Sequence, residues 1–189
     1  VYSVRKVPRK NVAAPKEIES RREIVEQVMP DGKRSFFNVE FTGQSVDKEI
    51  YALGGAFQTR FIGLAGIIGE YRQYRDRSDK LILSSLGLDM ALVQGGYASW
   101  SLYGQVSGFS GLLGLSGVGY GTRLQIFTAV GLALDFRLGQ LSMPDISFWD
   151  YDIRMGYFIN RFQIFFGYRG IESDLAVLAG WHGGVQVWF

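Results

Sequence analysis

Residues 123–141, RLQIFTAVGLALDFRLGQL, alternate between two unlike faces. The even positions, from Leu124 to Leu138, are almost all apolar, whereas the odd positions carry charges near both ends with Ala and Gly between them. A period of two is the signature of a β-strand whose faces meet different environments. The small residues and opposite charges suit a crowded polar lumen, which leaves the apolar face for lipid. This inside-out pattern is typical of a small transmembrane β-barrel.

The composition agrees with a barrel and excludes several other classes. A chain of 189 residues is one domain's worth. With 47% hydrophobic residues and a mean hydropathy of +0.06, it has no run approaching the roughly 20 apolar residues of a membrane-spanning helix. A net charge of only +2 argues against nucleic acid as a partner. The absence of cysteine excludes disulfides, thiolate metal sites and a cysteine nucleophile.

The same alternation marks further strands along the chain. We count eight candidates, in residues 35–44, 58–74, 81–93, 97–120, 123–141, 148–159, 161–170 and 177–189. The Gly- and Ser-rich stretch 97–120 contains either one irregular strand or two short ones. Because a transmembrane strand needs roughly 9–11 residues, eight strands and their turns account for residues 35–189. We therefore predict an all-β fold, an eight-stranded antiparallel transmembrane barrel with an N-terminal extension.

The turns should alternate between the two sides of the membrane, since bacterial barrels have short periplasmic turns and longer outer loops. We expect the polar or short turns on the periplasmic side, together with both chain termini: residues 75–80, 121–122 and 160. The remaining connections should lie outside: residues 45–57, 94–99, 139–147 and 171–176.

Residues 1–34 differ from the rest of the chain. Their start is basic, and residues 16–29 could form a short helix that is marginal in isolation. We predict a periplasmic extension, partly helical. It is either a simple leader or a contact, made with a periplasmic protein partner or with anionic lipid headgroups.

The last strand resembles a known class of proteins. In WHGGVQVWF, residues 181–189, one face carries Trp181, Val185, Val187 and Phe189. Bacterial outer-membrane barrels commonly end in such an alternating strand with a terminal aromatic residue. Residues 35–189 are thus similar to small OmpA/OmpX-type barrels of Gram-negative cell envelopes. The resemblance implies insertion into outer-membrane lipid by the barrel-assembly machinery, which would read these four residues as its signal.

Charged residues on the inward faces define the candidate site. The strand directions predict two layers, which should pair their charges because an unpaired buried charge is very costly. The outer layer is Asp89, Asp135, Arg137, Asp150, Asp152, Arg154 and Arg169; the inner layer is Arg123, Arg161 and Glu40, with Glu70 and Arg72 as further candidates. We expect these ion pairs to fill the lumen. The alternatives are a ligand pocket under the outer rim and a gated polar path.

His182, the only histidine, is a weak candidate for catalysis. Some outer-membrane barrels are lipid-modifying enzymes or proteases with histidine in their sites, and here Ser173 and Asp174 lie in the preceding loop. A general base needs a nucleophile and an orienting partner nearby. The alternative is that His182 is a structural histidine, hydrogen-bonded within the lumen. One histidine and no cysteine give no basis for a metal site, and no cofactor motif is present.

These observations favour a non-enzymatic barrel with a filled lumen, a structural or anchoring component of the envelope or of an envelope assembly. Three alternatives remain at this stage. The first is a lipid-modifying barrel enzyme that uses His182. The second is a narrow channel. The third is a soluble, lipocalin-like binder in which the apolar faces turn inward.

Overall fold

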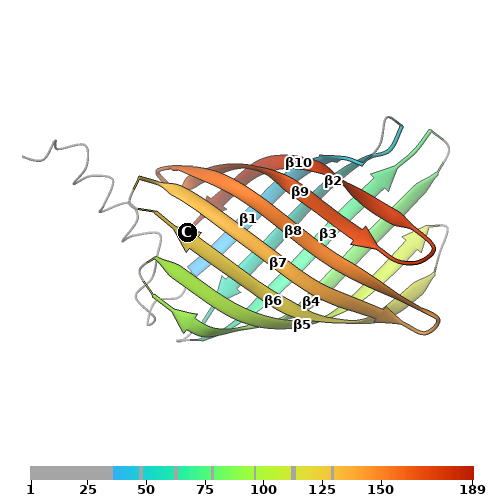
Figure 1. The fold of residues 1–189 in the computed structure, drawn as a ribbon, viewed down its shortest axis with the longest axis horizontal. Helices are drawn as coiled ribbons and strands as arrows, with labels where there is room; N and C mark the ends of the chain where they lie inside the picture. Colours follow the sequence, from blue (N-terminus) through green and yellow to red (C-terminus); the bar gives the residue numbers. More distant parts are fainter. Residues whose placement is uncertain are drawn as a thin grey trace, which may run out of the picture.

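The computed structural model describes residues 36–46, 49–61, 64–77, 79–95, 97–111, 114–128 and 130–189. They form a closed antiparallel barrel of ten strands, each paired with its neighbours in the sequence, with β1 against β10 (Figure 1). The strands are β1 (Phe36–Ser45), β2 (Tyr51–Arg60), β3 (Ala65–Arg75), β4 (Lys80–Gln94), β5 (Ala98–Gly111), β6 (Leu115–Phe127), β7 (Leu132–Met143), β8 (Ile146–Ile159), β9 (Phe162–Glu172) and β10 (Val177–Trp188). No helix among the described residues is long and apolar enough to cross a membrane.

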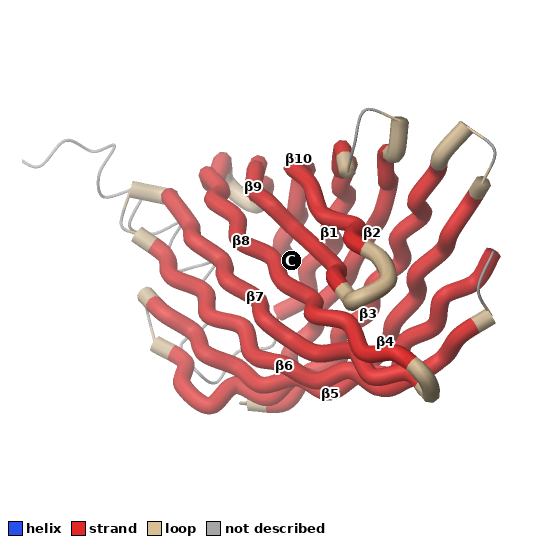
Figure 2. The backbone as a smooth tube through the Cα atoms, turned by 45° about the vertical axis from the view of Figure 1, so that its right-hand side comes forward, coloured by secondary structure: helices blue, strands red, loops and turns tan. Residues whose placement is uncertain are grey.

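The connections between strands alternate between the two ends of the barrel (Figure 2). We call the end where β1 begins and β10 finishes the terminal end, and the other the distal end. The connections at the terminal end are residues 61–64, 95–97, 128–131 and 160–161; those at the distal end are 46–50, 76–79, 112–114, 144–145 and 173–176. The expected sides are therefore wrong for residues 75–80, which turn at the distal end, and for 94–99, which turn at the terminal end. Residues 121–122 lie within β6.

The predicted count of eight strands is wrong. Two stretches that we expected to be continuous each contain a turn: residues 58–74 span the end of β2 and β3, and residues 123–141 are the end of β6 and most of β7. Residues 97–120, for which we left open one irregular strand or two short ones, span β5 and the start of β6. The expected loop 45–57 contains the first half of β2. The helix and extension predicted in residues 1–34 lie outside the described residues.

The hidden turns share a geometric cause. In the β6–β7 hairpin, Phe127 pairs with Ala133, so both members of each pair are odd-numbered or both even-numbered. Paired residues point to the same face of a sheet. The alternation of faces therefore continues unbroken through the turn, in which Gly131 adopts a φ of 82°. The β2–β3 and β5–β6 hairpins have the same parity, so periodicity alone does not separate these hairpins from long strands.

The barrel has an apolar outside and a polar inside. Phe41, Leu88, Val106 and Phe166 point outward and are 64%, 70%, 62% and 59% exposed. The inward positions of the same strands hold buried polar side chains such as Glu40. This is the surface of a transmembrane barrel. The lipocalin-like alternative required the apolar faces inside and is wrong for the described strands.

A cross-strand disulfide tests the β6–β7 hairpin directly. Leu124 and Phe136 are register partners that face outward, so oxidised L124C/F136C should form an intramolecular disulfide, which mass spectrometry of the digested protein would detect. In one continuous strand these Cα atoms would be about 40 Å apart, beyond the reach of a disulfide. As a control, L124C/V185C places the cysteines on strands that are not neighbours and should remain reduced. Absence of the first cross-link would contradict the ten-stranded register.

Candidate functional site: a closed, charge-paired lumen

The described lumen contains equal numbers of opposite charges. All of its cations are arginines, and no lysine side chain points inward from a described strand. The arginines are Arg60, Arg72, Arg123, Arg137, Arg154 and Arg169, and the carboxylates are Glu40, Glu70, Asp89, Asp135, Asp150 and Asp152. Six positive and six negative groups sum to zero, as expected where burying an unpaired charge is very costly.

The largest group of charges lies toward the distal end. Arg137 and Arg169 each bridge Glu70 and Asp150, with N–O distances of 2.8–3.3 Å. Arg72 adds a third cation, 3.2 Å from Glu70 through its Nε. These five residues form the Glu70 cluster. Because a planar guanidinium donates from several nitrogens at fixed angles, each bridging arginine satisfies two carboxylates at once.

Neutral side chains complete the Glu70 cluster. Arg72 Nη1 donates to Gln44 Oε1 at 2.7 Å, and Gln44 Nε2 donates to the Arg169 backbone oxygen at 3.0 Å. The Tyr103 hydroxyl accepts from Arg137 Nε at 3.1 Å, and the guanidinium stacks over the ring, 4.8 Å from its centroid. The excess cation of this cluster is thus held by uncharged acceptors and by an aromatic face.

A second group, the Asp135 cluster, lies nearer the middle of the barrel. Asp135 accepts from Arg123 Nε at 2.9 Å, from Arg154 Nη2 at 3.0 Å and from Gln125 Nε2 at 3.0 Å. Arg154 also donates to Glu40 Oε2 at 2.6 Å across the lumen. The four charged residues of this cluster come from strands on both sides of the β1–β10 seam, so the bonds tie the closed barrel together.

A buried pair near the terminal end joins this network. Arg60 bonds to Asp89, and both side chains are 2% exposed. Gln58 links the pair to the Asp135 cluster, since its amide donates to Asp89 at 3.1 Å and accepts from Arg123 at 3.0 Å. The Arg60 guanidinium also lies over the Phe36 ring, 5.2 Å from its centroid.

The structure regroups the two layers that we expected. Asp135 and Arg154, placed in the outer layer, bond directly to Arg123 and Glu40, placed in the inner layer. Asp89, which we also expected in the outer layer, pairs with Arg60 near the terminal end. Glu70 and Arg72, candidates for the inner layer, lie in the distal cluster. The regrouping follows from the tilt and stagger of the strands, which set how high each residue lies along the barrel axis. Tilt and stagger depend on the number of strands, and the sequence pattern predicted the wrong number.

Arg161 is a separate correction. We expected it in the inner layer, but it occupies the exposed β8–β9 turn beside Asn160, whose φ is 56°. Its backbone oxygen accepts from Trp188 N at 2.9 Å. The side chain is therefore outside the lumen.

His182 is enclosed within the network. Its Nε2 lies 2.9 Å from Asp152 Oδ1, and its Nδ1 lies 3.5 Å from Thr42 Oγ1. The residue is 1% exposed. Ser173 lies in the distal turn, where its hydroxyl accepts from the backbone N–H groups of Leu175 and Ala176. The structure thus surrounds the histidine with a carboxylate and a hydroxyl inside the barrel, away from Ser173.

Apolar side chains cover the charged region at both ends of the lumen. At the terminal end, the aromatic residues Phe36, Phe127, Phe158 and Trp188 pack together with ring centroids 5.3–6.5 Å apart. At the distal end, a larger cluster comprises Ala52, Tyr74, Leu83, Phe109, Leu141, Met143, Phe148 and Ile171. These apolar side chains thus lie on either side of the charged region.

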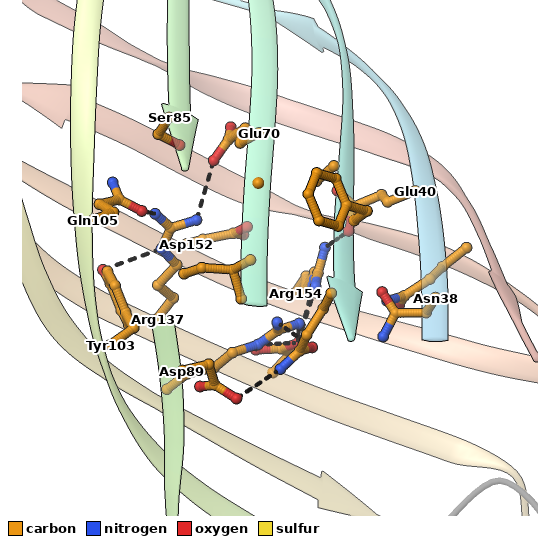
Figure 3. A pocket seen from close by; sticks show the side chains of 18 of the residues that line it. Asn38, Glu40, Glu70, Ser85, Asp89, Tyr103, Gln105, Arg137, Asp152 and Arg154 are labelled. Carbon is orange, nitrogen blue, oxygen red and sulfur yellow. Dashed lines mark hydrogen bonds and ion pairs between the residues drawn. The ribbon is translucent and has the colours of Figure 1, made fainter. Parts of the chain in front are cut away.

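A small cavity remains inside the barrel, lined by members of both the Glu70 cluster and the Asp135 cluster (Figure 3). Its volume is about 60 Å³, and its lining includes Asn38, Glu40, Glu70, Asp152 and Arg137. The Asn38 side-chain nitrogen is buried and has no protein partner. A polar space of this size accommodates one or two water molecules. Within the described ranges, no group of three or more acidic or histidine side chains is arranged to hold a metal ion.

The four residues of the expected assembly signal lie on one face of the barrel's last strand and the residue after it. Trp181, Val185 and Phe189 point outward and are 58%, 38% and 67% exposed, and Val187 is partly buried on the same face. Phe189 N donates to the Phe37 backbone oxygen at 2.9 Å. The residues expected to form an assembly signal thus share the outer face beside β1.

Several residues of the network were missed in the sequence. Arg60, Gln58 and Gln44 were not assigned to the lumen, although in residues 51–60, YALGGAFQTR, Gln58 and Arg60 follow three small residues at the even positions. That alternation was the available signal. It was obscured because β2 is short and Gly-rich at its centre.

Comparisons with known proteins give weak matches. No family model matches the chain, and no curated protein matches it. Among solved structures, the barrel is similar to CdiB from Acinetobacter baumannii (TM-score 0.41, 14% identity, covering 75% of this chain and 39% of that one). It is also similar to the KdgM porin in complex with disordered oligogalacturonate (0.43, 8%, 82% and 99%) and to the Yersinia pestis outer membrane protein Ail (0.44, 12%, 82% and 99%).

Asp135 offers the sharpest test of the network. The substitution D135N preserves shape but leaves the cations of Arg123 and Arg154 short of a buried partner, which should destabilise the barrel by about 3–5 kcal/mol. Urea unfolding in lipid vesicles, followed by tryptophan fluorescence, would measure the loss. The control R77Q removes an exposed ion pair with Glu49 and should cost about 0–1 kcal/mol. Equal midpoints for D135N and the wild type would contradict the role of the network.

Proposed function

We propose that this protein is an integral outer-membrane β-barrel that does not conduct and that anchors a component of the cell envelope. The observation that carries the proposal is the lumen, in which paired charges lie between two apolar clusters. A barrel built in this way fills its interior for stability. What it offers to other molecules is then its outer face, its turns and the N-terminal extension.

The closed lumen favours an anchor over a narrow channel. A conducting path needs continuous polar space, whereas Phe127 and Trp188 pack across the terminal end and Phe109 and Phe148 across the distal end. An ion would also have to disrupt buried Arg–carboxylate pairs, each of which is costly to leave unpaired. We therefore propose that three successive regions of the lumen oppose the passage of an ion: the apolar cluster at each end and the ion pairs between them.

The same geometry supports a non-enzymatic role. A lipid-modifying enzyme needs its base and nucleophile where a substrate reaches them. The His182 ring is buried between Asp152 and Thr42, and the Ser173 hydroxyl is occupied within the distal turn. We therefore assign His182 to the lumen network.

The topology supports an arrangement in the membrane. β1 begins and β10 ends at the terminal end, so the segment that precedes β1 joins the barrel at this end. We place this end in the periplasm, where the extension would contact a periplasmic protein and where the β10 face with Trp181, Val185, Val187 and Phe189 would be recognised by the barrel-assembly machinery.

Planar bilayer recordings test the closed lumen. The purified wild-type protein should give no conductance steps, because the apolar clusters exclude water from both ends. The variant D135N serves as an internal marker, since only a path through this lumen would respond to it. Steps in the wild type that change size in D135N would contradict the proposal, whereas steps identical in both would identify a contaminating porin.

Deletion of residues 1–34 tests the anchor. The truncated protein should still enter the outer membrane and run at a different gel mobility before and after boiling, as a folded barrel does. Chemical cross-linking in cells should join a periplasmic protein to the full chain and not to the truncated one. Retention of the same cross-linked protein after deletion would show that the extension is not the contact.

A further inference from the structure

Three neighbouring turns at the terminal end are apolar and uncharged. They are the β2–β3, β4–β5 and β6–β7 connections, and no charged residue occurs in their sequences. Of the five distal connections, by contrast, four contain at least one charged residue. The large side chains described in the three terminal turns are 49–60% exposed, and we call them the apolar rim: Phe61, Leu64, Tyr97 and Val130.

A β-bulge joins the apolar rim to the lipid-facing surface of β4. The register between β4 and β5 shifts between Ala91 and Val93. Successive residues of a regular strand point to opposite faces, and a bulge re-aims them. Here Leu92 and Val93 are both exposed, 42% and 54%. The apolar outer surface of β4, which includes Leu88 and Met90, therefore continues to the end of the strand.

The backbone of these turns is bonded in a way that lets it leave water. Tyr97 O accepts from Phe127 N at 2.8 Å, and Gly131 O accepts from Phe158 N at 2.8 Å. Leu64 O makes the same kind of bond to β4 at 2.7 Å. Each bond joins a turn to the strand that follows its hairpin. A backbone group in lipid has to find its partner within the protein, and these carbonyl groups do so.

The distal part of the same side of the barrel carries hydroxyl groups on its outer face. Ser84 on β4, Ser110 on β5 and Ser116 on β6 are exposed. Ser84 and Ser116 are both register partners of Gly108, so they share one face. A hydroxyl group is costly to place in hydrocarbon and favours headgroups or water. On β4–β6, the apolar part of the outer face is therefore displaced toward the terminal end.

The fourth terminal turn has the opposite character. It connects β8 to β9 through Asn160 and Arg161, which are both exposed. A charged side chain is expensive within a membrane, so this turn has to reach headgroups or water. The terminal end is thus apolar from β2 to β7 and polar at β8–β9.

We propose that the apolar rim is buried among the acyl chains of the leaflet at the terminal end, and that the barrel is tilted, with β4–β6 displaced toward the distal side. The partner of this surface is phospholipid, because the rim is uncharged, its described carbonyl groups are bonded internally and it continues the lipid-facing surface of β4. With the terminal end in the periplasm, as proposed above, this is the glycerophospholipid leaflet. The tilt itself depends neither on that orientation nor on what residues 1–34 contact.

Spin labels measure the depth of the rim directly. The chain contains no cysteine, so a single introduced cysteine gives a single labelled position in the full chain. Y97C and V130C, labelled and folded into phosphatidylcholine vesicles, should collide more with oxygen, which concentrates in hydrocarbon, than with a water-soluble nickel chelate. The matched control R161C lies at the same end, in the polar turn, and its oxygen-to-nickel collision ratio should be several-fold lower.

A pair of arginine substitutions tests the tilt through stability. V130R should lower the folding equilibrium constant in vesicles roughly tenfold or more, because the cost of an arginine facing lipid rises with its depth. I159R is the matched variant, since Ile159 is 51% exposed against 54% for Val130 but lies beside the polar turn. It should lower the constant much less. Urea unfolding measures both, and if V130R does not fold, the spin labels still decide.

Two results would overturn the proposal. If labels at Y97C and V130C collide with the nickel chelate as often as the label at R161C, the rim lies in water. A protein partner would then be the occupant to consider. If V130R and I159R lower the folding constant equally, the two sides of the terminal end lie at the same depth and the barrel is not tilted.

Discussion

Backbone hydrogen bonding in a lipid environment is the constraint on which this structure depends. A bilayer has no water to satisfy an open strand edge, so a spanning sheet has to close. Here β1 pairs with β10 from Asn38 opposite Trp188 to Ser45 opposite Trp181. The pairing extends to the last residue, since Phe189 N donates to the Phe37 oxygen. Closure therefore requires the final strand of the chain, and the lumen exists only after this seam forms.

Closure around ten strands creates an interior that small side chains do not fill. An eight-stranded barrel is just wide enough for its own side chains, and two more strands add space that long residues occupy here. Arginine suits this role because it reaches across the lumen and binds two carboxylates from fixed directions. Arg137 and Arg169 both bridge Glu70 and Asp150, and Arg154 bridges Asp135 and Glu40. With apolar clusters at both ends, the interior of the barrel resembles a polar core with hydrophobic caps.

The outer face is less uniform than the lumen. Over most of the barrel, large apolar residues project into the lipid region, and on β3 the ring of Phe57 from β2 lies over Gly69. At the distal end of β3 and β4, Arg75 and Lys80 are register partners, and both are exposed. The described charges of the lumen are already paired with one another, which is why our interpretation looks for function outside the lumen.

The sequence by itself determined the class of fold and the direction in which most side chains point. Alternation in residues 123–141 correctly predicted that Asp135 and Arg137 face inward while Leu124 and Phe136 face lipid, because face is a local property of a pleated strand. It did not determine the strand number, since a hairpin that pairs Phe127 with Ala133 keeps the alternation in phase. Only the tertiary structure decided which charges meet. Asp135 bonds to Arg154 of its own predicted layer and also to Arg123 of the other layer. Strand order, tilt and stagger set the height of each residue, and these belong to the closed barrel as a whole.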